Sequence, residues 1–170
     1  MHWGIAVSKK RVVVPIADPG SPRKGYQPTP GVYALDLDTG EVIWTHKAVR
    51  GCTPEASEQP RTRRRGARNR WPACPRQYAF SAAVSSTPDL ALASALNGHT
   101  MAFDLSDGTI LWEDNTVQPY NTVNGIEAHG GAIDSPGAQI IDDMLFVQSG
   151  YGMFGQMPGN VLLAYRLQSP

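Results

Sequence analysis

The sequence predicts an all-β fold built from repeated four-stranded antiparallel units. The first observation behind this is an internal repeat: residues 31–44 read GVYALDLDTGEVIW, and residues 98–112 read GHTMAFDLSDGTILW. The second is a composition with 17 Gly and 14 Pro in 170 residues, which suits a chain rich in turns. The third is a series of short apolar runs bounded by turn residues, the pattern that is typical of strands.

The repeat has a fixed register. Ala34 corresponds to Ala102 and Trp44 to Trp112, so the repeat distance is 112 minus 44, or 68 residues. Each copy reads as a hairpin in which a glycine completes the turn, because tight hairpin turns need a residue that tolerates positive φ. A third, shorter copy occupies residues 159–167. We interpret both tryptophans as core residues that mark the architecture and take no part in chemistry.

The apolar runs follow the same order in each copy of the repeat. The expected strands are residues 4–7, 12–17, 32–37 and 41–44, then 81–86, 90–96, 100–105 and 109–112, then 137–141, 144–149 and 161–167. Successive four-stranded units of this kind predict a partial β-propeller of about three blades in a single domain. A β-sandwich or barrel is the structural rival, but it does not explain the spaced Ala, Asp, Gly and Trp pattern.

We expect blade one at about 4–46, an insertion at 47–80, blade two at about 81–114, a loop at 115–135 and an incomplete blade three at about 136–167. The turns between first and second strands, and between third and fourth strands, are short. The long connections therefore gather at the opposite end. Long loops on one end of a rigid scaffold are where binding or catalytic sites are normally built.

The composition excludes several kinds of partner. The chain carries 15 basic and 15 acidic residues, so no overall field favours nucleic acid. No apolar run approaches the roughly 20 residues that a membrane-spanning helix needs, and the N-terminus lacks the layout of a signal peptide.

Cys52 and Cys74 lie in one expected loop, compatible with a disulfide in an oxidising compartment. Six arginines between residues 61 and 70 are expected to form a solvated insertion rather than a phosphate-binding patch.

Asp134 is the leading candidate catalytic residue. Aligning the first strands of the three units places Asp134 where the chain enters the central channel of the propeller, at the end that carries the long connections. A carboxylate there could accept a proton or bind a cation. Gly130 and Gly131 would let the backbone approach a flat ligand. The alternative is that Asp134 only accepts hydrogen bonds from loop amides and that the two glycines only shape a turn.

Other residues are expected near the same place. His2 and Trp3 enter at the level of Asp134, where Trp3 would form an aromatic wall for a ring-shaped ligand or simply pack. The insertion before Asp134 offers further oxygen and nitrogen ligands: Asn121, Asn124, Glu127 and His129. The segment 150–159, GYGMFGQMPG, would suit a lid or an ordered packing loop.

The hairpin pattern resembles the repeat of the pyrroloquinoline quinone (PQQ) enzymes, eight-bladed propellers with an A-x-D-x-x-T-G-x-x-x-W tryptophan-docking motif. Ala34, Asp36, Thr39, Gly40 and Trp44 all match this motif. The stretches MHWGIAV, LNGHTMAFDLSDGTILWEDNT, TVNGIEAHGGAIDSPG and SGYGMFGQMPGNVLLAY are similar to the C-terminal part of polyvinyl-alcohol dehydrogenase-like quinoproteins. The similarity covers nearly the whole chain except residues 53–70.

This resemblance implies a periplasmic or secreted dehydrogenase that oxidises a small or polymeric alcohol. It implies PQQ as the cofactor, usually with calcium, an aspartate as general base, and an electron acceptor such as a c-type cytochrome. The metal ligands do not map onto residues of this chain. Three blades of a ring of about eight lead us to expect a C-terminal fragment that is inactive alone. The alternative function is a non-catalytic scaffold similar to the outer-membrane assembly lipoprotein, which binds protein partners.

Overall fold

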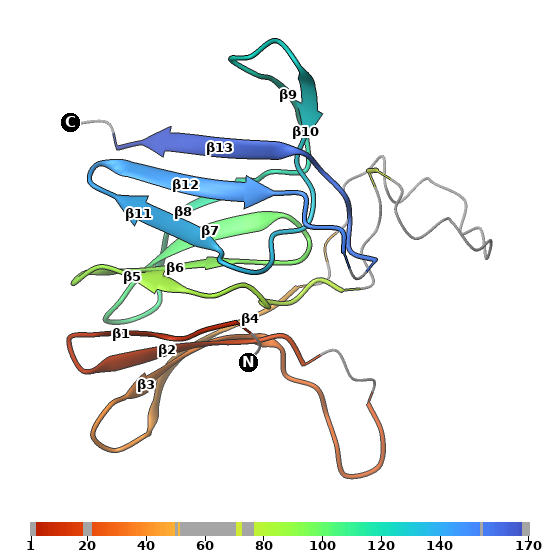
Figure 1. Cartoon of the computed structure of the whole chain (residues 1–170). Coiled ribbons are helices and arrows are strands. Elements are labelled where there is room, and N and C mark those ends of the chain that lie inside the picture. The colour runs from red at the N-terminus through yellow and green to blue at the C-terminus, as the bar shows by residue number, and fades with distance from the viewer. Residues whose placement is uncertain are drawn as a thin grey trace.

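A computed structural model gives the fold (Figure 1) and describes residues 3–18, 22–49, 51, 71–72, 77–153 and 155–167. Three stacked antiparallel sheets make up the main body. The first sheet contains β1 (Ala6–Ser8), β2 (Arg11–Ile16), β3 (Gly31–Asp36) and β4 (Val42–Lys47). The second contains β5 (Ser85–Ser86), β6 (Leu90–Ser94), β7 (His99–Asp104) and β8 (Ile110–Asn115). The third contains β11 (Ala138–Ile141), β12 (Met144–Ser149) and β13 (Val161–Arg166).

Strands that are consecutive in the sequence are also neighbours in each of these sheets. The part of the chain that the structure describes contains strands and turns but no helix, which confirms the all-β prediction. Short turns connect first to second strands at one end of the stack, and the long connections lie at the other end (Figure 1). We call this second end the long-loop end.

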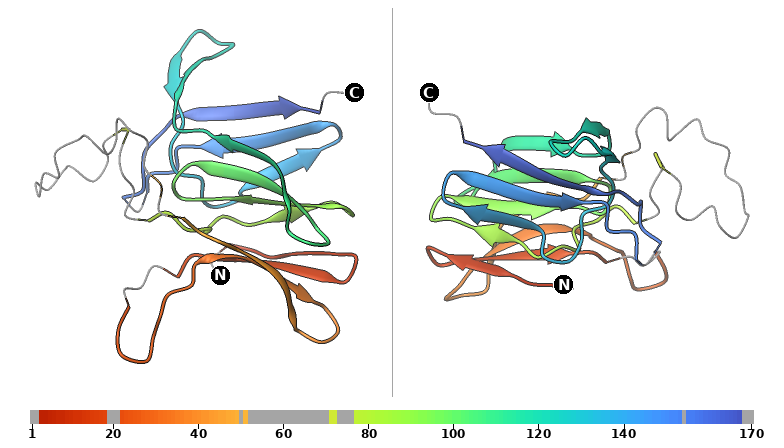
Figure 2. Two further views of the ribbon diagram at one scale, coloured as in Figure 1. Left: turned by 180° about the vertical axis from the view of Figure 1, so that it is seen from behind. Right: turned by 45° about the horizontal axis from the view of Figure 1, so that its top comes forward.

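A small hairpin interrupts the segment before the third sheet, where the sequence predicts a loop. It consists of β9 (Pro119–Asn121) and β10 (Glu127–His129). Figure 2 shows that this hairpin projects away from the stacked sheets. The two strands are only three residues long, too short to show the alternation by which strands are recognised.

The two full copies of the repeat form the same turn. Asp36 Oδ1 accepts the backbone N–H groups of Asp38 and Thr39, at 2.9 and 3.0 Å. Asp104 Oδ1 accepts the Ser106 hydroxyl at 2.5 Å and the Ser106 N–H at 2.8 Å. These hydrogen bonds stabilise the charged carboxylates and lower the pKa of both aspartates. The recurring aspartate of the motif is therefore explained by turn formation.

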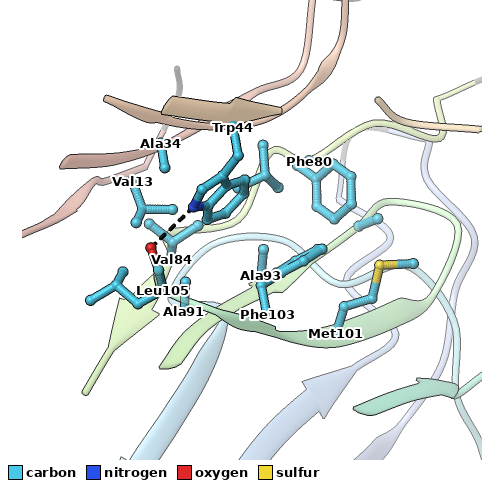
Figure 3. Packing of buried hydrophobic residues seen from close by; sticks show 12 residues of the cluster. Val13, Ala34, Trp44, Phe80, Val84, Ala91, Ala93, Met101, Phe103 and Leu105 are labelled. Carbon is cyan, nitrogen blue, oxygen red and sulfur yellow. Dashed lines mark hydrogen bonds between the residues drawn. The ribbon is translucent and has the colours of Figure 1, made fainter. Parts of the chain in front are cut away.

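The core between the first and second sheets surrounds Trp44 (Figure 3). The indole stacks on Phe103 with ring centroids 5.6 Å apart, and its Nε1 donates to the Leu105 carbonyl oxygen at 3.0 Å. Ala34 pairs with Trp44 across β3 and β4, and both side chains are buried in the same cluster. The interpretation of Trp44 as a core residue is thus confirmed.

The second and third sheets pack through the equivalent surfaces. Trp112 lies edge-on against Tyr165, with ring centroids 5.0 Å apart, and both border the cluster formed around Leu92 and Val147. The Tyr165 hydroxyl donates to Asp114 Oδ2 at 2.5 Å. The same face of each sheet therefore packs on the opposite face of the next one, as expected for propeller blades.

Candidate functional site

The candidate site lies at the long-loop end, at the segment that leads from β10 into β11. Backbone hydrogen bonds hold this segment in place: Ala132 N–H donates to the Met157 carbonyl at 2.9 Å, and Ile133 N–H to the Ala95 carbonyl at 3.2 Å. Ile133 is fully buried, and Ser135 adopts a positive φ of 61°. Asp134, between them, is therefore presented by a fixed backbone.

Asp134 accepts three hydrogen bonds, two of them from distant parts of the chain. Its Oδ1 accepts from the indole Nε1 of Trp3 at 2.5 Å and from the backbone N–H of Ser135 at 2.9 Å. Its Oδ2 accepts from the Gln156 side-chain amide at 3.1 Å. Only 4% of Asp134 is exposed. Within the described ranges no ion pair reaches this carboxylate, so neutral and backbone donors compensate its burial.

The structure brings Trp3 and Asp134 together, although Trp3 lies in the segment before the first sheet and Asp134 in the segment before the third. The hydrogen bond to Asp134 fixes the direction of the indole edge, and 43% of Trp3 is exposed. An indole with one edge fixed and its body accessible is suited to stacking on a planar ligand.

Gln156 is a contributor that the sequence prediction missed. It lies in the connection between β12 and β13, is buried, and supplies the donor to Asp134 Oδ2. It sits in a segment rich in Gly and Met that has no strand or helix periodicity. No pattern in the sequence singles it out.

Gly130 and Gly131 make close backbone approaches to other parts of this chain. A Cβ on Gly130 would lie 1.8 Å from the Thr116 carbonyl oxygen, and one on Gly131 would lie 2.3 Å from that of Pro158. The Gly130 carbonyl also accepts the Nε1 hydrogen bond of Trp71, at 2.6 Å. In the described residues, protein atoms therefore occupy the space beside both glycines.

Trp71 forms a second aromatic contact at this end of the molecule, which the sequence did not predict. Its ring lies against that of His129, with centroids 4.2 Å apart and planes at 30°. His129 belongs to β10, and its backbone N–H donates to Asn160 Oδ1 at 2.9 Å. The Trp71–His129 pair thus covers the base of the projecting hairpin.

Asn124 lies in the turn of that hairpin, and none of its hydrogen bonds within the described residues goes to Asp134. Its side-chain oxygen accepts from Thr122 Oγ1 at 2.6 Å and from the Ile126 N–H at 3.3 Å. These contacts stabilise the turn. Four other predictions fall outside the described residues: those for His2, Cys52, Cys74 and the arginines between 61 and 70.

A separate cavity of about 240 Å³ lies between the first and second sheets. His46, Phe80, His99 and Glu113 are among its lining residues, and none of the candidate site residues is. Burial lowers the pKa of His46, while His99 Nδ1 lies 3.2 Å from Glu113 Oε1. Over the ranges that the structure covers, no group of three His, Cys, Asp or Glu side chains is placed to hold a metal ion.

Comparison with known proteins supports the resemblance found in the sequence. The chain is 36% identical over 174 residues to a polyvinylalcohol dehydrogenase from a Pseudomonas species, a match that covers 97% of this chain and 24% of the relative. It is 34% identical over 152 residues to a polyvinylalcohol dehydrogenase from Sphingopyxis, covering 89% of this chain and 21% of that one. The chain therefore spans less than a quarter of the length of these curated relatives. No family model matches the sequence.

Solved structures confirm the propeller fold. A quinohemoprotein alcohol dehydrogenase from Comamonas testosteroni aligns with a TM-score of 0.56 and 18% identity, covering 97% of this chain and 19% of that one. A europium-containing methanol dehydrogenase aligns with a TM-score of 0.55 and 21% identity, covering 98% and 23%. At these identities the likeness concerns the fold. None of the residues described forms a helix long and apolar enough to cross a bilayer.

Proposed function

We propose that this chain, similar over nearly its whole length to polyvinylalcohol dehydrogenases, forms part of a quinone-dependent dehydrogenase that oxidises an alcohol. The observation that carries the proposal is the buried carboxylate of Asp134, joined to the half-exposed indole of Trp3 at the long-loop end. The names of the relatives support the reaction class. The two residues supply a proton acceptor and an aromatic surface in one place.

Asp134 is the proposed general base. Its Oδ1 accepts two of the three hydrogen bonds, which fix the orientation of the carboxylate. Among the described residues, Oδ2 accepts one bond, the longer one from Gln156, and a carboxylate oxygen offers more than one acceptor direction. Oδ2 is therefore the atom with capacity to accept the proton of a substrate hydroxyl.

Trp3 is the proposed contact for the cofactor. The resemblance implies PQQ, a planar quinone that accepts two electrons from the alcohol when it is bound. The accessible indole, held at its N–H edge by Asp134, fits a flat ring of this kind. His2, Asn124, Gly130 and Gly131 remain predicted cofactor contacts, although the space beside both glycines is taken by protein atoms.

The described residues do not fit a calcium site. Both oxygens of Asp134 already accept N–H donors, and in the covered ranges Asp134 belongs to no group of three His, Cys, Asp or Glu side chains that could hold a metal ion. Calcium prefers six to eight oxygen ligands. The proposed chemistry of this chain is therefore restricted to Asp134 and Trp3.

Location and partners follow from the family resemblance alone. We propose a periplasmic or secreted location, a small-molecule or polymeric alcohol as substrate, and an electron acceptor such as a c-type cytochrome.

The test is the Asp134→Asn variant of the complete protein, assayed for dye reduction with PQQ and alcohols. Asparagine retains an oxygen that accepts from Trp3 and Ser135, and the Gln156 amide is able to turn its own oxygen toward the new amide group. The fold should survive while turnover falls by roughly 10²- to 10⁴-fold. Asp104→Asn, in a turn at the opposite end, is the matched control and should leave turnover unchanged.

Retained turnover in Asp134→Asn would contradict the assignment of Asp134 as the base. If the wild-type protein neither binds the quinone nor reduces the dye, the dehydrogenase proposal fails, and the protein-binding scaffold becomes the better account.

A further inference from the structure

The inference concerns the cavity of about 240 Å³ between the first and second sheets. We call the contact between these two sheets the first interface, and the contact between the second and third sheets the second interface. The two interfaces use equivalent surfaces, so several lining residues of the cavity have a counterpart in the second interface. At three positions the first interface lacks a hydroxyl group that the second interface has.

The first of these positions is Ala48, which lines the cavity and corresponds to Thr116. Each of the two residues directly follows the fourth strand of its sheet. The Ala48 N–H donates to the Pro30 carbonyl at 2.9 Å, as the Thr116 N–H donates to the Gly98 carbonyl at 3.0 Å. The Thr116 hydroxyl also donates to the Gly98 carbonyl, at 2.8 Å. Ala48 has no hydroxyl, so the first interface lacks this group and the volume that it fills.

The second position is Ala95, which also lines the cavity and corresponds to Ser149. The Ala95 N–H donates to the carbonyl of His99, the first residue of the third strand in its sheet. Ser149 likewise pairs with Val161, the first residue of β13. In the second interface the hydroxyl oxygens of Ser149 and Thr116 lie 2.7 Å apart, and both residues are buried. A hydrogen-bonded pair therefore fills the second interface where the first has two alanines and a cavity.

The third position is Phe103, which corresponds to Tyr165, the fifth residue of its third strand. In the second interface the Tyr165 hydroxyl donates to Asp114 Oδ2 at 2.5 Å. The counterpart of Asp114 is His46, whose ring lies 5.1 Å from that of Phe103 between centroids. His46 lines the cavity, and its ring nitrogens form no hydrogen bond with any described residue. The first interface thus has a plain ring where the second has a phenol bonded to a carboxylate.

The polar groups of the cavity have spare capacity to accept hydrogen bonds. Glu113 Oε1 lies 3.2 Å from His99 Nδ1, and no donor in the described ranges reaches the other oxygen, Oε2. Burial lowers the pKa of His46, so its imidazole is neutral near pH 7 and one ring nitrogen is an acceptor. Among the described lining residues there is no Lys or Arg. The cavity therefore favours a ligand that donates a hydrogen bond and carries no negative charge.

The remaining wall of the cavity suits an aromatic ring. It includes the buried side chains of Phe80 and Met101, which Figure 3 shows at the first interface. The His46 ring stands edge-on to Phe80, with centroids 5.8 Å apart and planes at 80°. An apolar cavity of about 150 Å³ is enough to bind one benzene ring. The larger volume here leaves room for one ring with a hydroxyl group.

We propose that this cavity binds a small phenol, whose ring packs against Phe80 and Met101 and whose hydroxyl donates to Oε2 of Glu113. The ligand supplies from solution the ring-bound hydroxyl that Tyr165 supplies at the second interface. Neither Asp134 nor Trp3 is among the described lining residues, so this site does not rest on the proposed dehydrogenase function.

The probe is phenol itself, titrated into the full chain and followed by ligand-observed NMR. A ligand of this size should bind with a Kd on the order of 1 mM. Toluene, which has a similar ring but no hydroxyl, should bind roughly tenfold more weakly, because it offers no donor to the carboxylate. Benzoate should not bind measurably, since its charge would face Glu113. Equal affinities for phenol and toluene, or tighter binding of benzoate, would overturn the proposal.

The second interface supplies the variant that closes the cavity. Ala48→Thr/Ala95→Ser copies its hydrogen-bonded pair into the first interface, so phenol binding should fall by roughly tenfold or more while the Tm is kept or raised. Undiminished binding of phenol in this folded double variant would place the ligand elsewhere and contradict the proposal.

Glu113→Gln gives a measurement that does not depend on the double variant. It removes the charge of the acceptor, so phenol should bind several-fold more weakly while toluene binding is unchanged. Glu127→Gln, in the projecting hairpin, is the matched control and should change neither affinity. Equal effects of the two glutamine substitutions on phenol binding would refute the role of Glu113. None of these readouts uses catalytic turnover, so failure here and failure of the dehydrogenase proposal are distinguishable.

Discussion

The indole N–H of Trp3 and the carboxylate of Asp134 form a 2.5 Å hydrogen bond across 131 positions of sequence. It connects the entry to the first sheet with the entry to the third sheet, while the second sheet lies between them in the stack (Figure 1). The bond therefore fixes the long-loop end across the full width of the described stack.

Replacing Trp3 with Phe should destabilise the chain. Phenylalanine keeps an aromatic ring but removes the donor, which leaves the Ser135 N–H as the remaining described donor to Asp134 Oδ1. Hydrogen bonds to charged groups contribute about 1.5–3 kcal/mol, and the part-buried position of Trp3 places the expected loss near the lower value. Urea unfolding measures it. Trp112→Phe is the control, since no described acceptor is bonded to the Trp112 N–H; a larger loss in that variant would argue against the assigned role of the Trp3 bond.

Gly108→Ala should destabilise the native chain more than Gly40→Ala does. Both positions have positive φ, which costs an L-residue with a Cβ about 1–2 kcal/mol. At Gly108 the new methyl group also displaces the Trp44 ring, so we expect roughly 1–3 kcal/mol in addition from overpacking. Thermal unfolding of the two variants gives the comparison. Similar losses would mean that the Trp44 ring moves aside without cost.

Tyr165→Phe should weaken the contact between the second and third sheets by about 1.5 kcal/mol. The ring and its edge-on packing against Trp112 remain, but the 2.5 Å bond to Asp114 is lost. The companion variant Asp114→Asn retains an acceptor for the hydroxyl and should cost less. If Asp114→Asn proved the more harmful of the two, the hydroxyl would not be the group that matters.

Alkaline pH should reduce the contribution of Tyr165 to the free energy of unfolding. Burial and the neighbouring Asp114 raise the pKa of Tyr165 above its ordinary value of 10.0. The unfolded chain therefore releases this proton first, so the contribution to stability is complete below pH 10 and is lost as the pH rises through the folded-state pKa. The difference in unfolding free energy between wild type and Tyr165→Phe should shrink above pH 10. A constant difference up to pH 12 would contradict this.

Acid should weaken the two repeat turns. Hydrogen bonds from the turn lower the pKa of Asp36 and Asp104 below 3.8, so their contribution is present above that pH and is lost as the pH falls through the lowered folded-state values. The double variant Asp36→Asn/Asp104→Asn should show a shallower loss of Tm between pH 5 and pH 2 than the wild type. Asp107→Asn serves as a single-site control in an adjacent turn position.

The repeat made the stack predictable. The matching positions of Ala34 and Ala102, and of Trp44 and Trp112, define the register of third and fourth strands, and the glycine turns define their hairpins. The hairpin β9–β10 was not predictable, because its strands are three residues long and the first of them begins at Pro119, a residue that disfavours strand interiors.

In the candidate site, only the residues that can be aligned through the first strands of the repeat were predictable. Aligning first strands places Trp3 and Asp134 at the same level, and the structure brings them into contact. Gln156 and Trp71 lie in segments without a counterpart in the other units, so their positions depend on tertiary packing. The close approach at Gly130 likewise depends on Thr116, which no local pattern connects to it.

In the stack, the same face of each sheet packs on the opposite face of the next sheet. This arrangement bears on how a gene for such a chain is able to change in length. The three stacked sheets meet their neighbours through the same pair of surfaces, so gaining or losing a whole unit of about 68 residues recreates an interface that already exists. Insertions shorter than a unit are accommodated at the long-loop end, outside the ladders. Unequal recombination between repeats would therefore preserve folding more often than point insertion within β2, β3, β6 or β7.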